Sequence, residues 1–257
     1  MIHYYKFRQD TLDPVPARDV YVKRPPGRGW PEECPPIRAA NACGFDILAS
    51  FDLTFIQRKP TPSNPCPWRV EPDIVLTSDF DWAATDDAEG APLTQQYAWF
   101  WEKGQKLPHP ISDNVYEAIK NQLKISSLLY LKTDPNEQLL MTDIPNLVRP
   151  FRTVSALVDT DWYPASYCYH IAIELDPAHK KIEIKKGDPL CRMMVVRRDT
   201  YFAKQMTPEE FDTFFERGQG WLSTHGRPHE AAEDSGHLDI THTYSKQQLK
   251  SRFVTMK

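Results

Sequence analysis

The chain has 257 residues, of which 40% are hydrophobic, and its 31 basic and 35 acidic side chains give a formal net charge of −4. This length allows one hydrophobic core, with or without an extension. The 23 prolines, about 9% of the chain against a usual ~5%, exclude a mostly helical bundle, and the 12% aromatic content excludes wholesale disorder. Because basic and acidic residues are interspersed, we expect no sequence-independent nucleic-acid binding.

Targeting and cysteine patterns favour an intracellular protein. The chain does not open on a positive segment followed by an apolar run, and it contains no uncharged apolar stretch of the ~18 residues that a membrane span needs. The five cysteines are odd in number, widely spaced and form no C-x-x-C pair, which predicts free thiols. We therefore expect a cytoplasmic protein without membrane contact, or a virion component if the chain is of phage origin.

Residues 1–36 are predicted to form a Pro-rich N-terminal arm. An extended aromatic opening at residues 2–5 precedes residues 23–31, where prolines and glycines leave little helix propensity. An arm of this kind packs either on a neighbouring subunit or on its own domain, and the sequence does not distinguish the two.

Residues 37–227 are predicted to form a mainly β domain. Apolar and polar residues alternate over 51–56, and β-like runs follow at 68–70 and 74–77. Residues 128–131 and 139–141 are typical of buried strands, separated by a turn at 133–136.

The densest strand pattern covers the second half of this domain. Strands are expected in four segments, which are residues 153–158, 167–175, 181–185 and 191–196. Turn signals lie between them, at residues 162–164, 176–177 and 187–189, and predict antiparallel connections. Short strands at this spacing are typical of a β-sandwich, a barrel or a β-clip-like core.

Two helices complete the expected fold. Ser112 is a suitable N-cap for a helix over 113–124, and the sequence Thr207-Pro208-Glu209-Glu210 is a capping box that begins a second one. Gly218 is a natural C-terminal stop for that helix. Residues 228–257 have little apolar content and are predicted to form a polar, His-containing tail.

Several sequence blocks resemble a bacterial and phage family of unknown function. They comprise residues 2–5, 14–17, 39–42, 44–47, 158–164 and 186–191. The resemblance spans roughly residues 2 to 200 and implies no established activity.

A second resemblance carries chemistry. Four blocks are similar, in the same order, to motifs of the dUTPase and dCTP deaminase superfamily: residues 43–47 (CGFDI), 157–162 (LVDTDW), 186–193 (KGDPLCRM) and 217–224 (RGQGWLST). The resemblance implies that Asp159 is a catalytic general base that activates a water and that Trp162 binds beside the sugar. It also implies that Arg217 and Trp221 belong to a ligand-binding segment that closes over the phosphates and the base.

Each of these blocks also has a purely structural interpretation. Asp159 and Asp161 suit a turn whose carboxylates accept backbone N–H groups, and residues 186–188 suit a β-turn. Arg217-Gly218 suits the end of a helix. The superfamily's P-R-S-G phosphate motif has no counterpart in residues 142–147, which lie where it should stand.

The tail is the remaining candidate for chemistry. His225, His229, His237, Asp239 and His242 lie close together in the sequence, and His237-Leu238-Asp239 resembles the H-x-D pair of iron oxygenases. A metal site needs such ligands on a rigid frame, and residues 230–236 have the composition of a flexible segment. We therefore expect no metal and no cofactor.

Two functional hypotheses follow. The first, favoured by the missing phosphate motif and the acidic balance, is a non-enzymatic assembly or interaction protein, such as a phage structural component, with a protein partner or a homo-oligomeric state. The alternative, favoured by the ordered recurrence of four blocks, is a small-ligand or nucleotide-binding protein, or a dUTPase-like hydrolase centred on Asp159.

Overall fold

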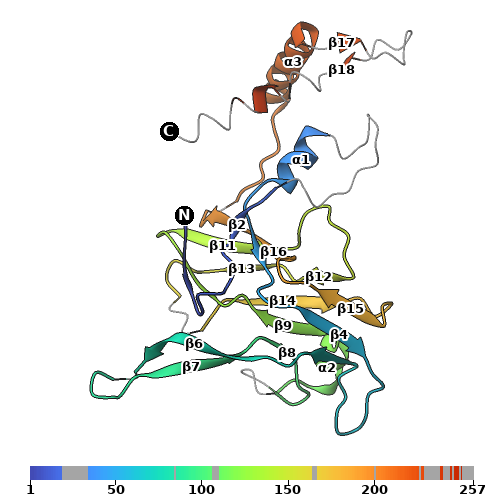
Figure 1. Cartoon of the computed structure of the whole chain (residues 1–257). Helices are drawn as coiled ribbons and strands as arrows, with labels where there is room; N and C mark the ends of the chain where they lie inside the picture. Colours follow the sequence, from blue (N-terminus) through green and yellow to red (C-terminus); the bar gives the residue numbers. More distant parts are fainter. Residues whose placement is uncertain are drawn as a thin grey trace. The chain divides into compact units, whose positions relative to one another are not determined.

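The computed structural model describes residues 1–18, 34–83, 85–105, 110–163, 167–199 and 201–225, with the short segments 227–228, 238–239, 244, 246–248 and 250 (Figure 1). The chain divides into two compact units. One comprises Met1–Val22 and Asn41–Arg198, and the other comprises Lys23–Ala40 and Asp199–Lys257. The domain boundaries expected at residues 36 and 227 stay predictions.

The first unit is built from strands with one short helix. Its first strands are β1 (Ile2–Lys6), β2 (Val15–Pro16), β3 (Phe45–Leu48), β4 (Leu53–Gln57), β5 (Trp68–Glu71), β6 (Val75–Trp82), β7 (Ala91–Gln96) and β8 (Ala98–Phe100). Helix α2 (Asp113–Ile119) follows, and the remaining strands are β9 (Gln122–Ser126), β10 (Leu129–Thr133), β11 (Glu137–Thr142), β12 (Phe151–Thr153), β13 (Ala156–Val158), β14 (His170–Leu175), β15 (Lys181–Ile184) and β16 (Pro189–Arg197). The predicted mainly β class is confirmed.

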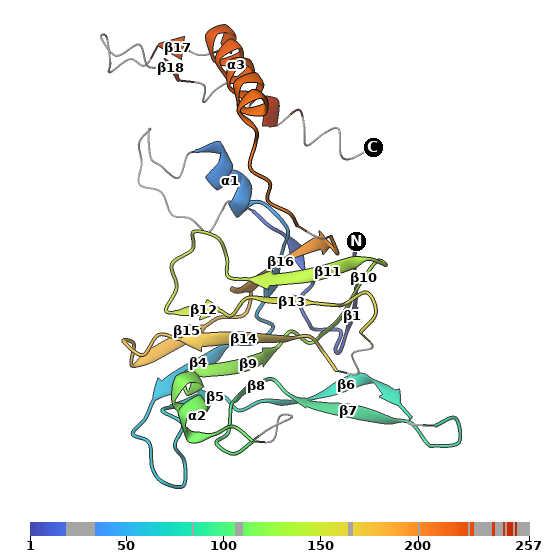
Figure 2. The same cartoon turned by 180° about the vertical axis from the view of Figure 1, so that it is seen from behind.

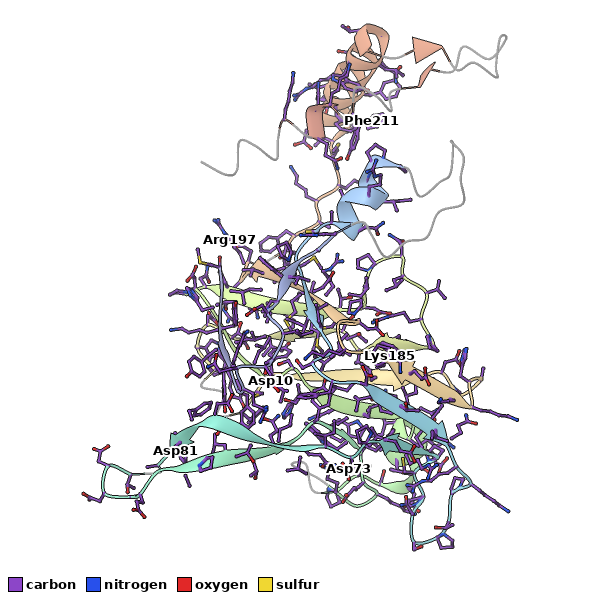
Figure 3. All side chains as sticks on the ribbon, viewed as in Figure 1. Asp10, Asp73, Asp81, Lys185, Arg197 and Phe211 are labelled. Carbon is purple, nitrogen blue, oxygen red and sulfur yellow. The ribbon has the colours of Figure 1, made fainter. Side chains whose placement is uncertain are left out.

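These strands form several antiparallel sheets. A five-stranded sheet has the order β13-β11-β16-β3-β2, and a four-stranded sheet has the order β12-β14-β9-β8. Smaller sheets pair β15-β4-β5, β1-β10 and β6-β7. In Figures 1 and 2 the five- and four-stranded sheets lie beside each other, and the β6–β7 hairpin, which carries Asp81 (Figure 3), extends from them.

Strands lie in each of the four expected segments over 153–196, but residues 153–158 are divided between β12 and β13, and the pairing partners are distant in sequence. Of the predicted turn at 162–164, residue 164 lies outside the described residues. β14 pairs with β9 and β12, β15 pairs with β4, and β16 lies between β11 and β3. At the three predicted turns the signals locate the ends of strands, but the two strands that flank each turn do not pair with each other. The opening residues also belong to a sheet, since β1 pairs with β10 of the same chain.

The core lies between these sheets. β14 alternates partly exposed and buried residues, so Ile171, Ile173 and Leu175 point inward, as period-two patterning requires. Trp68 and Phe55 are fully buried in the same hydrophobic cluster. The five cysteines are free, as expected.

Helix starts follow the sequence signals more closely than helix ends. The Ser112 hydroxyl accepts a hydrogen bond from the Val115 N–H, and Thr207 and Glu210 form a reciprocal capping box at α3 (Pro208–His225). The stop expected at Gly218 is wrong, because α3 continues to His225. Within the described residues, no helix is both long and apolar enough to cross a membrane.

Unit two contains the remaining elements. Besides α3, these are most of α1 (Pro35–Asn41), which the sequence did not predict, and the short strands β17 (Arg227–Pro228) and β18 (Leu238–Asp239). Phe211, labelled in Figure 3, stacks on Phe215 along α3 with ring centroids 5.7 Å apart, and both rings are about half exposed.

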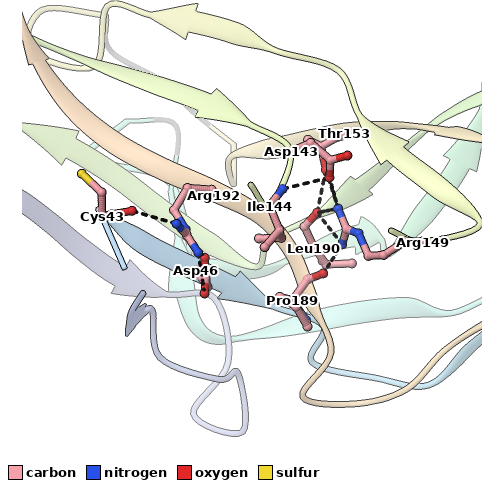
Figure 4. Close-up of polar contacts among 9 residues, drawn as sticks. All are labelled: Cys43, Asp46, Asp143, Ile144, Arg149, Thr153, Pro189, Leu190 and Arg192. Carbon is pink, nitrogen blue, oxygen red and sulfur yellow. Dashed lines mark hydrogen bonds and ion pairs between the residues drawn. The ribbon is translucent and has the colours of Figure 1, made fainter. Parts of the chain in front are cut away.

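A fully buried ion pair links strands β3 and β16. These strands carry the first and the third of the four blocks that are similar to dUTPase-superfamily motifs. The Arg192 guanidinium donates to both carboxylate oxygens of Asp46 and, over 2.9 Å, to the Cys43 carbonyl (Figure 4). Both side chains are 0% exposed. Next to them, Gly44 has φ +89°, and a Cβ there would lie 2.3 Å from the Met193 carbonyl oxygen, so only glycine fits.

We predict that Asp46→Ala destabilises the protein by about 3–5 kcal/mol, because it leaves the Arg192 charge buried without its carboxylate. The double variant Asp46→Leu, Arg192→Met should recover much of that loss. A suitable control is Glu117→Ala, which removes an exposed pair with Lys120 on α2 and should cost less than about 1 kcal/mol. Urea unfolding measures the stability of the three variants. Equal losses of stability in Asp46→Ala and Glu117→Ala would contradict the prediction.

Candidate functional site

The turn after β13 carries Asp159 and Trp162 and is fixed to the turn between β10 and β11. The Asn136 N–H donates to Asp161 Oδ2 over 3.1 Å, and the buried hydroxyls of Thr160 and Thr133 lie 2.8 Å apart. Within the turn, the Tyr163 N–H donates to the Asp159 carbonyl over 2.9 Å. These contacts hold Trp162 at the surface, where it is 64% exposed.

Arg198 binds both carboxylates of this turn. Its Nη1 lies 2.6 Å from Asp159 Oδ1, and its Nη2 donates to Asp161 Oδ1 over 2.8 Å. The amide of Gln138 also donates to Asp159 Oδ1, over 2.7 Å. The Gln138 hydrogen bond, followed by Arg198, holds the pKa of Asp159 below its ordinary value.

This environment bears on the chemistry expected of Asp159. A carboxylate with a lowered pKa is a weaker proton acceptor than a free one. The Oδ1 oxygen of Asp159 is already bound by Gln138 and Arg198. The observed contacts are those of a residue that fixes the turn. The general-base role of Asp159 stays a prediction.

A cavity of about 530 Å³ lies beside the turn, between it and the β1–β10 pair. Its lining is mainly aromatic: His3, Tyr4, Tyr5, Tyr130, Leu131, Lys132, Thr160, Asp161, Trp162 and Tyr163. The structure therefore brings Trp162 together with the aromatic opening of the chain. Asp159, next to the lining residue Thr160, is not itself part of the lining.

The rims of this cavity carry polar contacts. The Tyr4 hydroxyl donates to Asp13 Oδ1 over 2.9 Å, which raises the pKa of Tyr4, and His3 Nε2 lies 2.8 Å from Asp134 Oδ1. Lys132 is exposed on β10, opposite His3 in the strand register. Arg198 pairs with both Asp159 and Asp161, and Lys132 supplies a positive charge at the cavity.

Arg217 and Trp221 lie in helix α3 of the other unit. The glycine-containing segment 217–224 is helical, and a Cβ at Gly218 or Gly220 would meet no atom within 4 Å. Neither glycine is therefore required by packing. The ligand-binding role of Arg217 and Trp221 stays a prediction.

The described part of the chain contains no group of three or more His, Cys, Asp or Glu side chains placed to hold a metal ion. Of the residues proposed as metal ligands, His229, His237 and His242 lie outside the described residues, while His225 ends α3 and Asp239 lies in β18. The expectation of no metal stays a prediction for that tail.

Sequence reasoning missed three contributors to this site: Arg198, Gln138 and the β1 aromatics. Arg198 directly follows a long apolar strand, where a basic residue is ordinary, so no local signal marks it. The exposed pair Tyr4-Tyr5 did carry a signal, because two large aromatics on one short polar strand are unusual on a surface.

Comparisons with known proteins give a distant likeness only. No family model and no curated protein matches the chain. Among solved structures, a dUTPase of Staphylococcus bacteriophage 80alpha with dUpNHpp is 8% identical at a TM-score of 0.35, and the match covers 80% of this chain and 96% of that one. A dUTPase from phage phi11 of S. aureus, described with a structural Mg(II) ion, is 9% identical at the same TM-score and coverage. Such values do not establish family membership.

The comparison corrects the favoured functional hypothesis. The similar structures are phage dUTPases, which are enzymes, and not assembly proteins or structural components of a phage. The hypothesis of a non-enzymatic assembly protein is therefore withdrawn. The aromatic cavity beside Trp162 belongs to the first unit and supports a functional proposal.

Asp159→Asn should lower the melting temperature at neutral pH, because the amide cannot replace a carboxylate bound by Gln138 and Arg198. The folded-state pKa of Asp159 is depressed, so this carboxylate stabilises the folded protein fully at pH values above its ordinary pKa of about 4. That stabilisation is lost as the pH falls through the folded-state pKa. The difference in melting temperature between native and variant protein should therefore shrink in acid. Asp87→Asn, in the exposed loop between β6 and β7, is the control, and a difference that is constant with pH would contradict the prediction.

Proposed function

We propose that the first unit binds a nucleotide-type ligand in the cavity beside Trp162, with its ring against the aromatic lining and its phosphate toward Lys132. The observation that carries this proposal is the set of residues that line the cavity, which includes four tyrosines, Trp162 and one lysine. Aromatic faces stack on bases whatever the base, and a lysine ammonium attracts phosphate as a point charge.

The size and position of the cavity support the same ligand class. A volume of about 530 Å³ falls in the range of small-molecule sites, which is roughly 300–1,000 Å³. The side chains come from three segments, β1, β10 and the turn after β13, which are held together by strand pairing and by the Thr133–Thr160 contact. A site built on paired strands is largely formed before the ligand arrives, which lowers the entropy cost of binding.

Binding is supported more directly than hydrolysis. Hydrolysis needs a group that takes a proton from a water beside the phosphates. Of the two turn carboxylates, only Asp161 lines the cavity, and both are bound to Arg198. A hydrolytic role for Asp159 would require its contacts with Gln138 and Arg198 to loosen when the ligand is present.

Calorimetry with deoxynucleoside monophosphates and triphosphates tests the proposal. Trp162→Ala should weaken binding by about five- to hundredfold, as loss of one stacking ring does. Trp82→Ala is the matched control, since Trp82 is similarly exposed, at 58%, but lies on the β6–β7 hairpin away from the cavity lining. Absence of nucleotide binding, or equal losses in the two variants, would refute the proposed function.

Two further measurements define the chemistry. Lys132→Gln should weaken binding of phosphorylated ligands, because it removes the positive charge at the cavity. Phosphate release from triphosphates, compared in native protein and Asp159→Asn, tests hydrolysis separately. Turnover that is lost in the variant while the variant stays folded would assign the base role to Asp159.

A further inference from the structure

Tyr130 also lines a second cavity, of about 460 Å³, whose character differs from that of the first. Other lining residues include Thr94 and Gln95 of β7, Trp99 of β8, His170 of β14 and Tyr167. No Asp, Glu, Lys or Arg belongs to the lining that the described residues form. The cavity thus combines aromatic rings with uncharged hydrogen-bonding groups.

The His170 ring is held between two aromatic rings. It stacks on Tyr167, with centroids 4.9 Å apart and an interplanar angle of 17°, and it meets Trp99 edge to face at 4.7 Å and 84°. Burial, and secondarily the positive charge of Lys124, lowers the pKa of His170 to about 4. The imidazole is therefore neutral at physiological pH.

The contacts of Gln95 indicate the tautomer of this neutral ring. Its Nε2 donates to Ser126 Oγ over 2.6 Å and lies 3.3 Å from His170 Nε2. An amide NH2 group only donates, so in this amide orientation His170 Nε2 accepts and Nδ1 carries the proton. In this tautomer the Nδ1–H is the donor that the ring offers to a ligand.

We propose that this second cavity binds an uncharged planar heteroaromatic ring, of the nucleobase or nucleoside class, with an acceptor atom of the ligand bonded to His170 Nδ1–H. The aromatic walls favour a flat ring through stacking and edge contacts. Because the described lining includes no Lys or Arg, no lining side chain is placed to pair with a phosphate there. The site is separate from the one proposed for nucleotides and does not depend on it.

The hydrogen bond between the Tyr163 and Tyr167 hydroxyls lies between the two sites. The oxygens are 3.1 Å apart; Tyr163 lines the first cavity and Tyr167 the second. Tyr130 lines both cavities, and Tyr163 lines only the first. Substitutions that test the second cavity independently must therefore avoid Tyr130 and Tyr163.

Calorimetry with uncharged ligands, namely adenosine, cytidine and uridine, tests the proposal on the full chain. At least one of them should bind to the native protein, and Tyr167→Ala and His170→Phe should each weaken that binding by at least about fivefold. Trp162→Ala, which alters only the first cavity, should leave it unchanged, as should Trp82→Ala. His170→Phe keeps the stacking ring and removes the hydrogen bonds, so it isolates their contribution.

Tyr167→Ala keeps the test decisive if His170→Phe fails to fold, because Tyr167 is 45% exposed and its truncation leaves the core intact. A change in the imidazole 15N shift of His170 on ligand addition provides a readout that a purely structural role would not produce. Failure of all three nucleosides to bind would overturn the proposal. So would binding that is lost in Trp162→Ala and retained in Tyr167→Ala, which would place the ligand in the first cavity.

Discussion

The ion pair between Asp46 and Arg192 is the constraint on which the first unit depends. Two opposite charges with no solvent exposure are tolerable only when each is within hydrogen-bond reach of the other, so β3 and β16 must lie side by side in one register. Gly44 enforces the same register, because any side chain there would collide with the Met193 carbonyl. A second buried arginine, Arg149, binds Asp143 and the carbonyls of Pro189 and Leu190 at the start of the same strand (Figure 4).

The strand fixed in this way also positions the candidate site. β16 (Pro189–Arg197) carries the buried Arg192, and the residue that follows the strand, Arg198, binds Asp159 and Asp161. β11, its neighbour in the sheet, supplies Gln138, and the turn before β11 supplies the Asn136 N–H. The surface turn that presents Trp162 is thus tied to the centre of the five-stranded sheet through three elements. Asp159, which the resemblance makes a catalytic base, is bound here by Arg198 and Gln138, and Asp161 is bound by Arg198 and the Asn136 N–H.

The two cavities differ in the charge of the residues that line them. Both share Tyr130, but the first includes Lys132 and Asp161, whereas the lining described for the second has no Asp, Glu, Lys or Arg and includes a neutral histidine. Charged and uncharged parts of ligands are therefore expected to separate between them, for the same physical reason that unpaired charges avoid protein interiors. A surface with this many exposed aromatics, Tyr4, Tyr5, Trp162, Tyr163 and Tyr167, is otherwise a liability for a free protein.

The sequence by itself determined the local features. The capping box at Thr207, the cap at Ser112, the turn near Asn136 and the positions of most strands could be predicted, because each depends on residues only a few positions apart. Tertiary structure alone decided that Arg198 meets Asp159, that β1 contributes residues to the cavity beside Trp162, and that α3 continues past Gly218. Antiparallel pairing joins strands whatever their separation along the chain, so neither periodicity nor turn signals specify the partner. The contacts of each side chain follow from that pairing. Asp46 and Asp159 both lie in blocks that are similar to motifs of one superfamily, yet Asp46 forms a buried ion pair with Arg192, and Asp159 binds Arg198 in a surface turn.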